Sequence, residues 1–215
     1  MPPDSRPFPS IKVCGLTRAV DALAAHQAGA DALGVVAVPQ SPRAVTAKLA
    51  QKVFAELPAD IWKVAVMLNP TPAEASYFCQ QAGCNVVQLC GQEEVGEWQN
   101  FPLPILRRVG VAATEALTIQ AWAATAWGIV LDHPSAAGGT GKSVNPTLAH
   151  SFAAQHRSLL AGGLQPENVQ DFIQQVQPAG VDASSGLEKS PGIKDLSKMT
   201  AYIQNARATL EAIQI

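Results

Sequence analysis

Short apolar segments recur along the chain at intervals that fit a repeated strand–helix unit. The predicted strands are residues 11–14, 32–36, 62–68, 86–89, 104–109, 128–131, 159–161 and 180–183. Most of these segments are continuous apolar runs rather than alternating ones, which is typical of strands buried on both faces of a parallel sheet. The pattern therefore predicts eight parallel strands.

Helical segments lie between the predicted strands, and several of them have recognisable start signals. These are Thr17 for the first helix, Ser41-Pro42 for the second, Thr71-Pro72 for the third and Pro166 with Glu167 for the seventh. Hydroxyl side chains that cap the first turn, and prolines within it, are favoured at helix starts. We expect a helix after each strand.

A similar tetrapeptide recurs where a helix is expected to pass into the next strand. It reads Ala28-Gly29-Ala30-Asp31, Ala82-Gly83-Cys84-Asn85 and Ala179-Gly180-Val181-Asp182. Glycine readily adopts the left-handed conformation that follows many helices. We interpret the three tetrapeptides as copies of one helix-to-strand loop.

Alternation of strands and helices along almost the whole chain is compatible with an eightfold barrel or with an open doubly wound sheet. The count of eight strands favours the barrel. We therefore predict an α/β protein with a single (β/α)₈ (TIM) barrel at residues 11–215, preceded by a proline-rich extension at residues 1–10. In this fold the carboxyl ends of the strands and the loops that follow them carry the chemistry.

Composition and charge narrow the range of functions. Of the 215 residues, 47% are hydrophobic and 15% charged, which allows a large core, and the net charge of −2 offers no basic surface for nucleic acid or an anionic membrane. No segment has the pattern of a signal peptide or a membrane span, so we expect a cytoplasmic protein, either a monomer or a homodimer. The spacing of the four cysteines and four histidines indicates free thiols and no metal site.

Polar residues gather at the carboxyl ends of strands 6, 7, 8, 1 and 2, which form one contiguous arc in a closed barrel. They are Asp132, Gly162-Gly163, Ser184-Ser185-Gly186, Cys14 and Arg43. Glycine-rich turns after strands 7 and 8 let backbone N–H groups approach an anion closely, and a short helix beginning there adds its positive end. We predict a phosphate site at Gly162, Gly163, Ser184, Ser185 and Gly186, although a glycine pair taken alone also fits a simple tight turn.

Two residues at this mouth are candidates for proton transfer. Cys14 can act as a general base if helix ends or a nearby cation lower its pKa, and its ordinary alternative is a packed thiol. Asp132 can act as a general acid, and its alternative is a helix cap or a loop anchor. The neighbouring His133 is a further group to watch. Arg43 can hold a substrate carboxylate through two hydrogen bonds, or can be a solvated arginine.

Several blocks of sequence together resemble the phosphoribosylanthranilate isomerase family. They are residues 12–17, 41–43, 88–91, 131–132 with 138–141, 160–164 with 166–169, and 180–186 with Glu188, Pro191-Gly192 and Lys194-Asp195. The resemblance runs from end to end, and the blocks occur in the right order. One block alone is a weak signal, whereas the ordered set is specific.

The resemblance implies an Amadori rearrangement of N-(5′-phosphoribosyl)anthranilate, a step of tryptophan biosynthesis that needs neither metal nor organic cofactor. It implies that Asp132 protonates the ring oxygen of the sugar and that Cys14 removes the proton at C2′. Arg43 then faces the anthranilate carboxylate, and the loops at Gly162-Gly163 and Ser184–Gly186 hold the phosphate of this small-molecule substrate.

The chain departs from the family pattern at a few positions. Cys90 stands where the family usually has histidine, and His133-Pro134 follows Asp132 in place of the commoner small residue. Ser143-Val144-Asn145 replaces an aromatic–acidic–aromatic run, and the second strand lacks the usual phenylalanines. None of these changes removes the acid, the base or the arginine.

Two other functions fit parts of this pattern. Another sugar-phosphate barrel enzyme, such as an indoleglycerol-phosphate synthase or a ribulose-phosphate epimerase, shares the phosphate loops, because fold alone does not decide function. The synthase requires a catalytic lysine near the mouth, and the epimerase requires paired aspartates with metal-binding histidines; neither set is visible. A degenerate barrel that only binds a phosphorylated ligand or a partner protein is the non-enzymatic alternative, and a turnover assay separates it from the isomerase.

Overall fold

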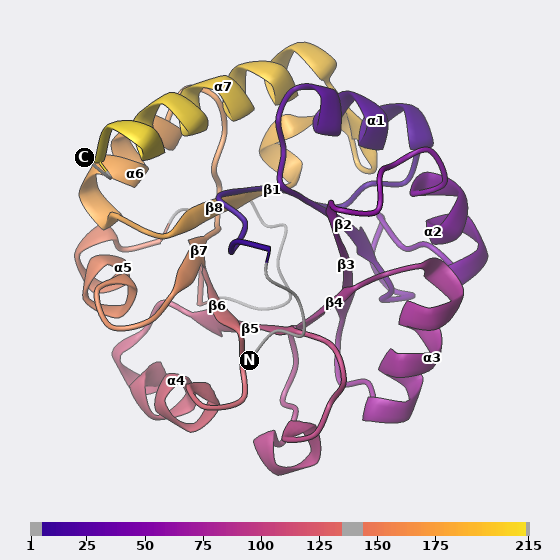
Figure 1. Cartoon of the computed structure of the whole chain (residues 1–215). Helices are drawn as coiled ribbons and strands as arrows, with labels where there is room; N and C mark the ends of the chain where they lie inside the picture. Colours follow the sequence, from indigo (N-terminus) through magenta and orange to yellow (C-terminus); the bar gives the residue numbers. More distant parts are fainter. Residues whose placement is uncertain (1–5, 135–143, 214–215) are drawn as a thin grey trace.

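Eight parallel strands form a closed barrel surrounded by helices (Figure 1). The structure is a computed structural model and describes residues 6–134 and 144–213. The strands are β1 (Ile11–Val13), β2 (Ala32–Val36), β3 (Trp62–Met67), β4 (Val86–Leu89), β5 (Ile105–Gly110), β6 (Gly128–Asp132), β7 (Ser158–Leu160) and β8 (Gly180–Ala183). Neighbours pair in chain order, and β8 pairs with β1. The predicted barrel is confirmed, and no predicted strand end differs from the observed one by more than one residue.

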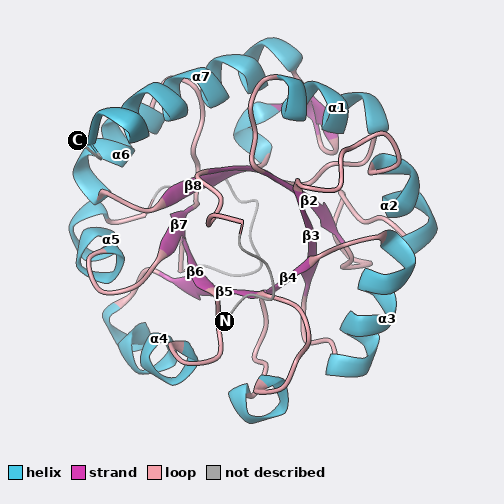
Figure 2. Ribbon diagram, in the orientation of Figure 1, coloured by secondary structure: helices cyan, strands magenta, loops and turns pink. Residues whose placement is uncertain are grey.

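Helices cover the outside of the barrel (Figure 2). They are α1 (Ala19–Gln27), α2 (Ala47–Val53), α3 (Pro72–Ala82), α4 (Ala116–Trp122), α5 (Pro146–Ala153), α6 (Val169–Val176) and α7 (Leu196–Ile213), with short 3₁₀ helices at Val95–Trp98, Ala113–Glu115 and Ser185–Leu187. The prediction of a helix after every strand is wrong for β4, because only the 3₁₀ turn Val95–Trp98 follows this strand. This segment contains glycines and prolines, which disfavour an α-helix. None of the described helices combines the length and apolar character needed to cross a membrane.

The predicted helix starts are only partly correct. Thr71 does open α3, with a reciprocal capping box to Glu74 and a proline in the first turn. Thr17 does not cap α1, because its hydroxyl donates to the carbonyl of Gly192, 2.5 Å away, and α1 begins two residues later. The second and seventh predicted starts lie in loops, and the residues that precede α2 and α6 are Thr46 and Asn168.

The predicted helix-to-strand loop occurs twice rather than three times. Gly29 and Gly83 have φ values of 105° and 70°, as expected for left-handed residues after a helix. Gly180 instead begins β8, and Gln177 takes the left-handed position after α6 with φ 53°. A Cβ atom on Gly180 would lie 2.6 Å from the carbonyl oxygen of Pro9. This glycine is therefore required by the close approach of the N-terminal segment.

The described part of the N-terminal extension closes the amino end of the barrel, where its trace crosses the centre of Figure 1. The Phe8 ring packs edge-on against Trp127, with ring centroids 4.9 Å apart. Trp127 also contacts Trp62, whose indole N–H donates to the carbonyl of Pro7 over 3.0 Å. The Arg6 guanidinium lies 3.7 Å from the centre of the Trp62 ring. Residues 6–10 thus pack as part of the barrel.

Phe8→Ala is expected to destabilise the protein without changing its chemistry. Phe8 is only partly buried, so the loss in the free energy of unfolding should be about 2 kcal/mol, below the usual cost for a fully buried phenylalanine. Denaturant unfolding measures this value, with the exposed Tyr77→Ala as the control that changes it by less than about 0.5 kcal/mol. Equal stability of the two variants would show that the Phe8 side chain contributes nothing to the free energy of unfolding.

A small antiparallel hairpin follows β8 and was not predicted from the sequence. It consists of β9 (Glu188–Ser190) and β10 (Ile193–Lys194), joined by Pro191-Gly192. Its strands are too short and too polar to give an apolar pattern. The backbone N–H of Lys194 donates to Asp21 in α1 over 3.2 Å, and the carbonyl of Gly192 accepts from Thr17. The hairpin is therefore fastened to the loop that follows β1.

Candidate active site

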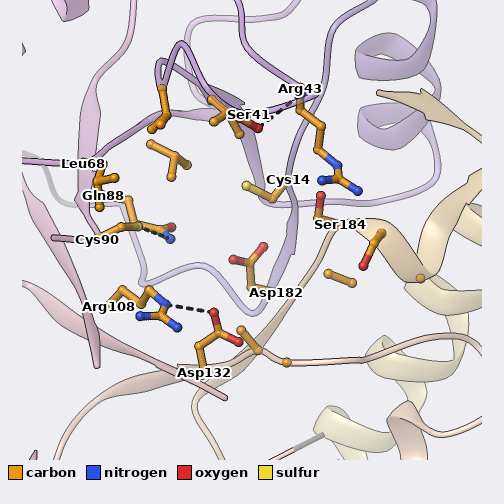
Figure 3. Close-up of a pocket in the computed structure, with 18 of the residues that line it drawn as sticks. Cys14, Ser41, Arg43, Leu68, Gln88, Cys90, Arg108, Asp132, Asp182 and Ser184 are labelled. Carbon is orange, nitrogen blue, oxygen red and sulfur yellow. Dashed lines mark hydrogen bonds and ion pairs between the residues drawn. The ribbon is translucent and has the colours of Figure 1, made fainter. Parts of the chain in front are cut away.

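A cavity of about 430 Å³ opens at the carboxyl end of the barrel. All eight residues that the sequence singled out line it: Cys14, Arg43, Asp132, Gly162, Gly163, Ser184, Ser185 and Gly186. They come from β6, β7, β8, β1 and β2 or the loops after them, which lie in contiguous order around the barrel. The predicted clustering of these residues is confirmed, and Figure 3 shows several of them facing one space.

One side of the cavity is formed by the loops after β7 and β8. Gly162 and Gly163 both have left-handed φ values, 87° and 68°, so this loop follows a path that other residues rarely adopt. Ser184 directly precedes the 3₁₀ helix Ser185–Leu187, and Ser185 is its first residue. Consecutive N–H groups in such turns can converge on an anion.

The opposite side of the cavity is apolar and lies over β2, β3 and β4. Val36, Val38, Val66 and Leu68 line it, together with Cys90. The amide of Gln88 donates to the Cys90 sulfur over 3.6 Å, and burial raises the pKa of the Cys90 thiol to about 12. The Cys90 thiol is therefore an uncharged part of this wall. It has no aromatic ring, and it does not gain or lose a proton near neutral pH as the histidine usual in the family can.

Cys14 follows β1 directly and is 8% exposed. Its backbone N–H donates to the carbonyl of Ala183, which continues the pairing with β8 and fixes the sulfur beside the cavity. Burial raises the pKa of the Cys14 thiol, while the Lys12 and Lys194 ammonium groups oppose this shift. The expected cations are present, but the expected lowering of the pKa is not found, because the loss of hydration outweighs them.

A buried ion pair lies at the base of the cavity, beneath Cys14. The Lys12 ammonium donates to Asp182 over 2.6 Å, and the Lys12 side chain is fully buried. Burial alone would lower the pKa of Lys12, but the Asp182 carboxylate outweighs it and raises that pKa. The second Asp182 oxygen, Oδ1, has no hydrogen-bond partner among the described residues, and Asp182 lines the cavity. It can accept a hydrogen bond from a hydroxyl or N–H group of a bound molecule.

Asp132 ends β6 and is held by two donors. Its Oδ2 accepts from the Nε of Arg108 over 2.9 Å, and its Oδ1 accepts from the backbone N–H of His133 over 2.7 Å. The Asp132 side chain is 13% exposed and lines the cavity, whereas His133 is not among the lining residues. Figure 3 shows Asp182 between Cys14 and Asp132. The glycine-rich run at residues 138–141, and Ser143, lie outside the described residues.

Arg43 lies at the rim and is engaged by a carboxylate of the protein itself. Its Nε and Nη2 donate to the two oxygens of Glu188 over 2.9 and 2.7 Å. The Lys194 ammonium donates to the same Glu188 over 2.9 Å. Burial alone would raise the pKa of Glu188, but the hydrogen bonds from Arg43 and the charge of Lys194 outweigh it and lower that pKa. Arg43 is therefore not a solvated arginine.

Sequence reasoning assigned no role to Arg108, Asp182, Glu188 or Lys194. Arg108 could have been found by alternation, because successive side chains of a strand point to opposite faces. Its neighbour Arg107 pairs with Glu93 and lies 4.9 Å from the centre of the Trp122 ring on the helix side, which leaves Arg108 facing the interior. No local signal pairs Arg43 with Glu188, which lie 145 positions apart.

The fold and this cavity place the chain among the (β/α)₈-barrel enzymes. Residues 11–205 match the family described as N-(5′-phosphoribosyl)anthranilate (PRA) isomerase. An N-(5′-phosphoribosyl)anthranilate isomerase from Pelobacter propionicus is 37% identical over 93% of this chain and 96% of its own length. One from Chlorobaculum parvum is 38% identical over 92% of this chain and 94% of its own.

Solved structures agree with the sequence relatives. The phosphoribosyl anthranilate isomerase from Thermotoga maritima superposes with a TM-score of 0.86 at 32% identity, covering 94% of this chain and all of its own. A phosphoribosyl anthranilate isomerase in complex with reduced 1-(o-carboxyphenylamino)-1-deoxyribulose 5-phosphate gives 0.82 at 30% identity over 94% of this chain and all of its own. The chain belongs to the phosphoribosylanthranilate isomerase family. It is an enzyme, an isomerase of tryptophan biosynthesis.

Proposed function

We propose that this chain converts N-(5′-phosphoribosyl)anthranilate to 1-(2-carboxyphenylamino)-1-deoxyribulose 5-phosphate with Asp132 as general acid and Cys14 as general base. The observation that carries the proposal is that a thiol, a carboxyl, two glycine- and serine-rich loops and an arginine line one cavity. A turnover assay with this substrate, followed by fluorescence of the anthranilate group, tests it. Absence of turnover by the folded wild-type protein contradicts it.

The first step is opening of the sugar ring. Asp132 gives a proton to the ring oxygen, the bond from that oxygen to C1′ breaks, and the nitrogen lone pair forms a C1′=N double bond. The product is a protonated Schiff base. The Asp132 carboxyl lines the cavity, where Arg108 and the backbone N–H of His133 hold it in place by hydrogen bonds.

The second step is removal of the C2′ proton. The Cys14 thiolate accepts this proton, the C2′–H electrons form a C1′=C2′ double bond, and the nitrogen becomes neutral. The resulting enolamine tautomerises to the ketone. The positive charge of the Schiff base acidifies C2′–H, and it also stabilises a nearby thiolate against the desolvation that raises the pKa of Cys14.

The walls of the cavity suit the two ends of this substrate. Backbone N–H groups of Gly162, Gly163, Ser184, Ser185 and Gly186 are proposed to hold the phosphate. The apolar side over β2, β3 and β4 then receives the aromatic ring, with Arg43 at the rim for its carboxylate. No metal or organic cofactor enters this mechanism.

Arg43→Ala is expected to raise KM far more than it lowers kcat. A contact with the substrate carboxylate exists in both the ground state and the transition state, and its loss should raise KM about 10- to 100-fold. Steady-state kinetics measures both constants, with a melting curve to confirm the fold. An unchanged KM in the folded variant contradicts the carboxylate contact.

Cytoplasmic location, and a state as monomer or homodimer, stay predictions. The biosynthetic role supports the first. Cell fractionation and light scattering of the purified protein test them.

A further inference from the structure

We propose that Glu188 is a positioning residue that fixes Arg43 so that one edge of its guanidinium faces the substrate carboxylate, with Lys194 supplying the charge that keeps this rim positive. The inference rests on the proposed function, because it deepens the role given there to Arg43. It concerns two residues of the β9–β10 hairpin: Glu188, which contacts Arg43 directly, and Lys194, which contacts Glu188.

Glu188 occupies only one edge of the guanidinium. An arginine presents two such edges, one formed by Nε and Nη2 and the other by Nη1 and Nη2, and each can bind a carboxylate through two hydrogen bonds. Glu188 takes the Nε and Nη2 edge, and Nη1 donates to no group in the part of the chain that the structure describes. Arg43 lines the cavity, so its second edge is available there without any break in the Glu188 contact.

Glu188 is itself held in place from several directions. Lys194 Nζ donates to it and also to the carbonyl of Ser184 over 3.0 Å, so one ammonium links the hairpin to the loop after β8. The Lys194 side chain is fully buried, and its backbone is tied to Asp21 in α1. Glu188 therefore cannot follow Arg43 if Arg43 moves, and it acts as a fixed anchor.

The stem of Arg43 is also confined. Gly15 has φ 71°, and a Cβ atom there would lie 2.6 Å from Arg43 Cδ and 2.5 Å from Ser184 Oγ. The loops after β1, β2 and β8 thus meet at this point. Contact at the stem and a bidentate bond at the head leave the Arg43 side chain a single orientation, which lowers the entropy cost of binding a ligand.

Charge explains why a lysine accompanies the pair. Arg43 and Glu188 alone sum to zero, and a substrate carboxylate near a neutral pair gains little net attraction. Lys194 brings the sum of the three groups to one positive charge, at contacts of 2.7–2.9 Å. The trio therefore holds Arg43 rigidly and still attracts an anion.

The test is a double-mutant cycle on the full-length enzyme with N-(5′-phosphoribosyl)anthranilate. Glu188→Gln keeps the size of the side chain but removes its charge, and it is expected to raise KM about tenfold while kcat changes less than about twofold. In the Arg43→Ala background the same change should alter KM less than about twofold, because Glu188 acts through Arg43. A purely structural residue would not give this split between KM and kcat.

Asp31→Asn is the matched control. It removes a carboxylate from the Arg207 ion pair, whose atoms are 2.8 Å apart, at the amino end of β2 and far from the cavity. Its KM and kcat should equal those of the wild type. Melting curves of all variants show whether each one folds, and Glu188→Asp, which keeps the charge, should recover part of the lost affinity if Glu188→Gln is poorly folded.

The outcomes separate this inference from the proposed function. If Arg43→Ala raises KM but Glu188→Gln does not, or if the two changes are additive, Glu188 does not position Arg43 and only this inference is overturned. If Arg43→Ala leaves KM unchanged, the carboxylate contact fails and this inference fails with it. If the folded wild type shows no turnover, the proposed function itself is wrong.

Discussion

Cys14→Ser is expected to abolish turnover while leaving substrate affinity within about tenfold of the wild type. The base acts chiefly in the transition state, so its loss falls on kcat rather than on ground-state binding. A serine hydroxyl is too weakly acidic to supply an anion at neutral pH, although it fits the same space. Steady-state kinetics gives kcat. The affinity is measured by binding of the substrate or of reduced 1-(o-carboxyphenylamino)-1-deoxyribulose 5-phosphate.

The role of Cys14 as the base also predicts how the activity of the wild type depends on pH. Burial raises the pKa of Cys14, and the base works only when deprotonated, so kcat/KM should rise with pH through and beyond neutrality. Alkylation of Cys14 by iodoacetamide, followed by peptide mass spectrometry, should show the same rise. The Cys90 thiol, whose pKa is near 12, should react much more slowly and serves as an internal comparison. Near-normal turnover of Cys14→Ser would remove Cys14 from the mechanism.

Asp132→Asn is expected to lower kcat by about 10²-fold or more, in line with the loss of a general acid. Asparagine can still accept the hydrogen bond from the backbone N–H of His133, so the loop should keep its conformation. It has no carboxyl proton to give to the ring oxygen. The melting temperature should therefore change little while turnover falls.

His133→Asn is the control for this assignment, because His133 is adjacent to Asp132 and an imidazole is a common proton donor in catalysis. His133 contacts Asp132 through its backbone N–H, and its carbonyl accepts from Arg108 over 2.9 Å. Both contacts survive a change of side chain. Turnover measured against pH for the wild type and the two variants decides between them, and a crippled His133→Asn beside a nearly normal Asp132→Asn would name His133 as the acid.

The sequence by itself determined the barrel and eight of the residues that line the cavity. A strand buried on both faces needs a continuous apolar run, so such strands are visible locally, and the residue after each run must lie at the carboxyl end. Cys14 and Asp132 were placed in this way. The tetrapeptide that contains Gly180 misled the same reasoning, because the approach of Pro9, not a loop conformation, requires that glycine.

Only the tertiary structure decided how the polar groups of the cavity are paired. Arg43 meets Glu188, Lys12 meets Asp182, and these partners are 145 and 170 positions apart in the chain. The pKa shift of Cys14 likewise depends on burial and on two cations, Lys12 in the preceding strand β1 and Lys194 in the distant β10. Periodicity and local motifs report on contacts within an element or across one turn, whereas these contacts arise only when the barrel closes and brings β1, β2 and β8 together.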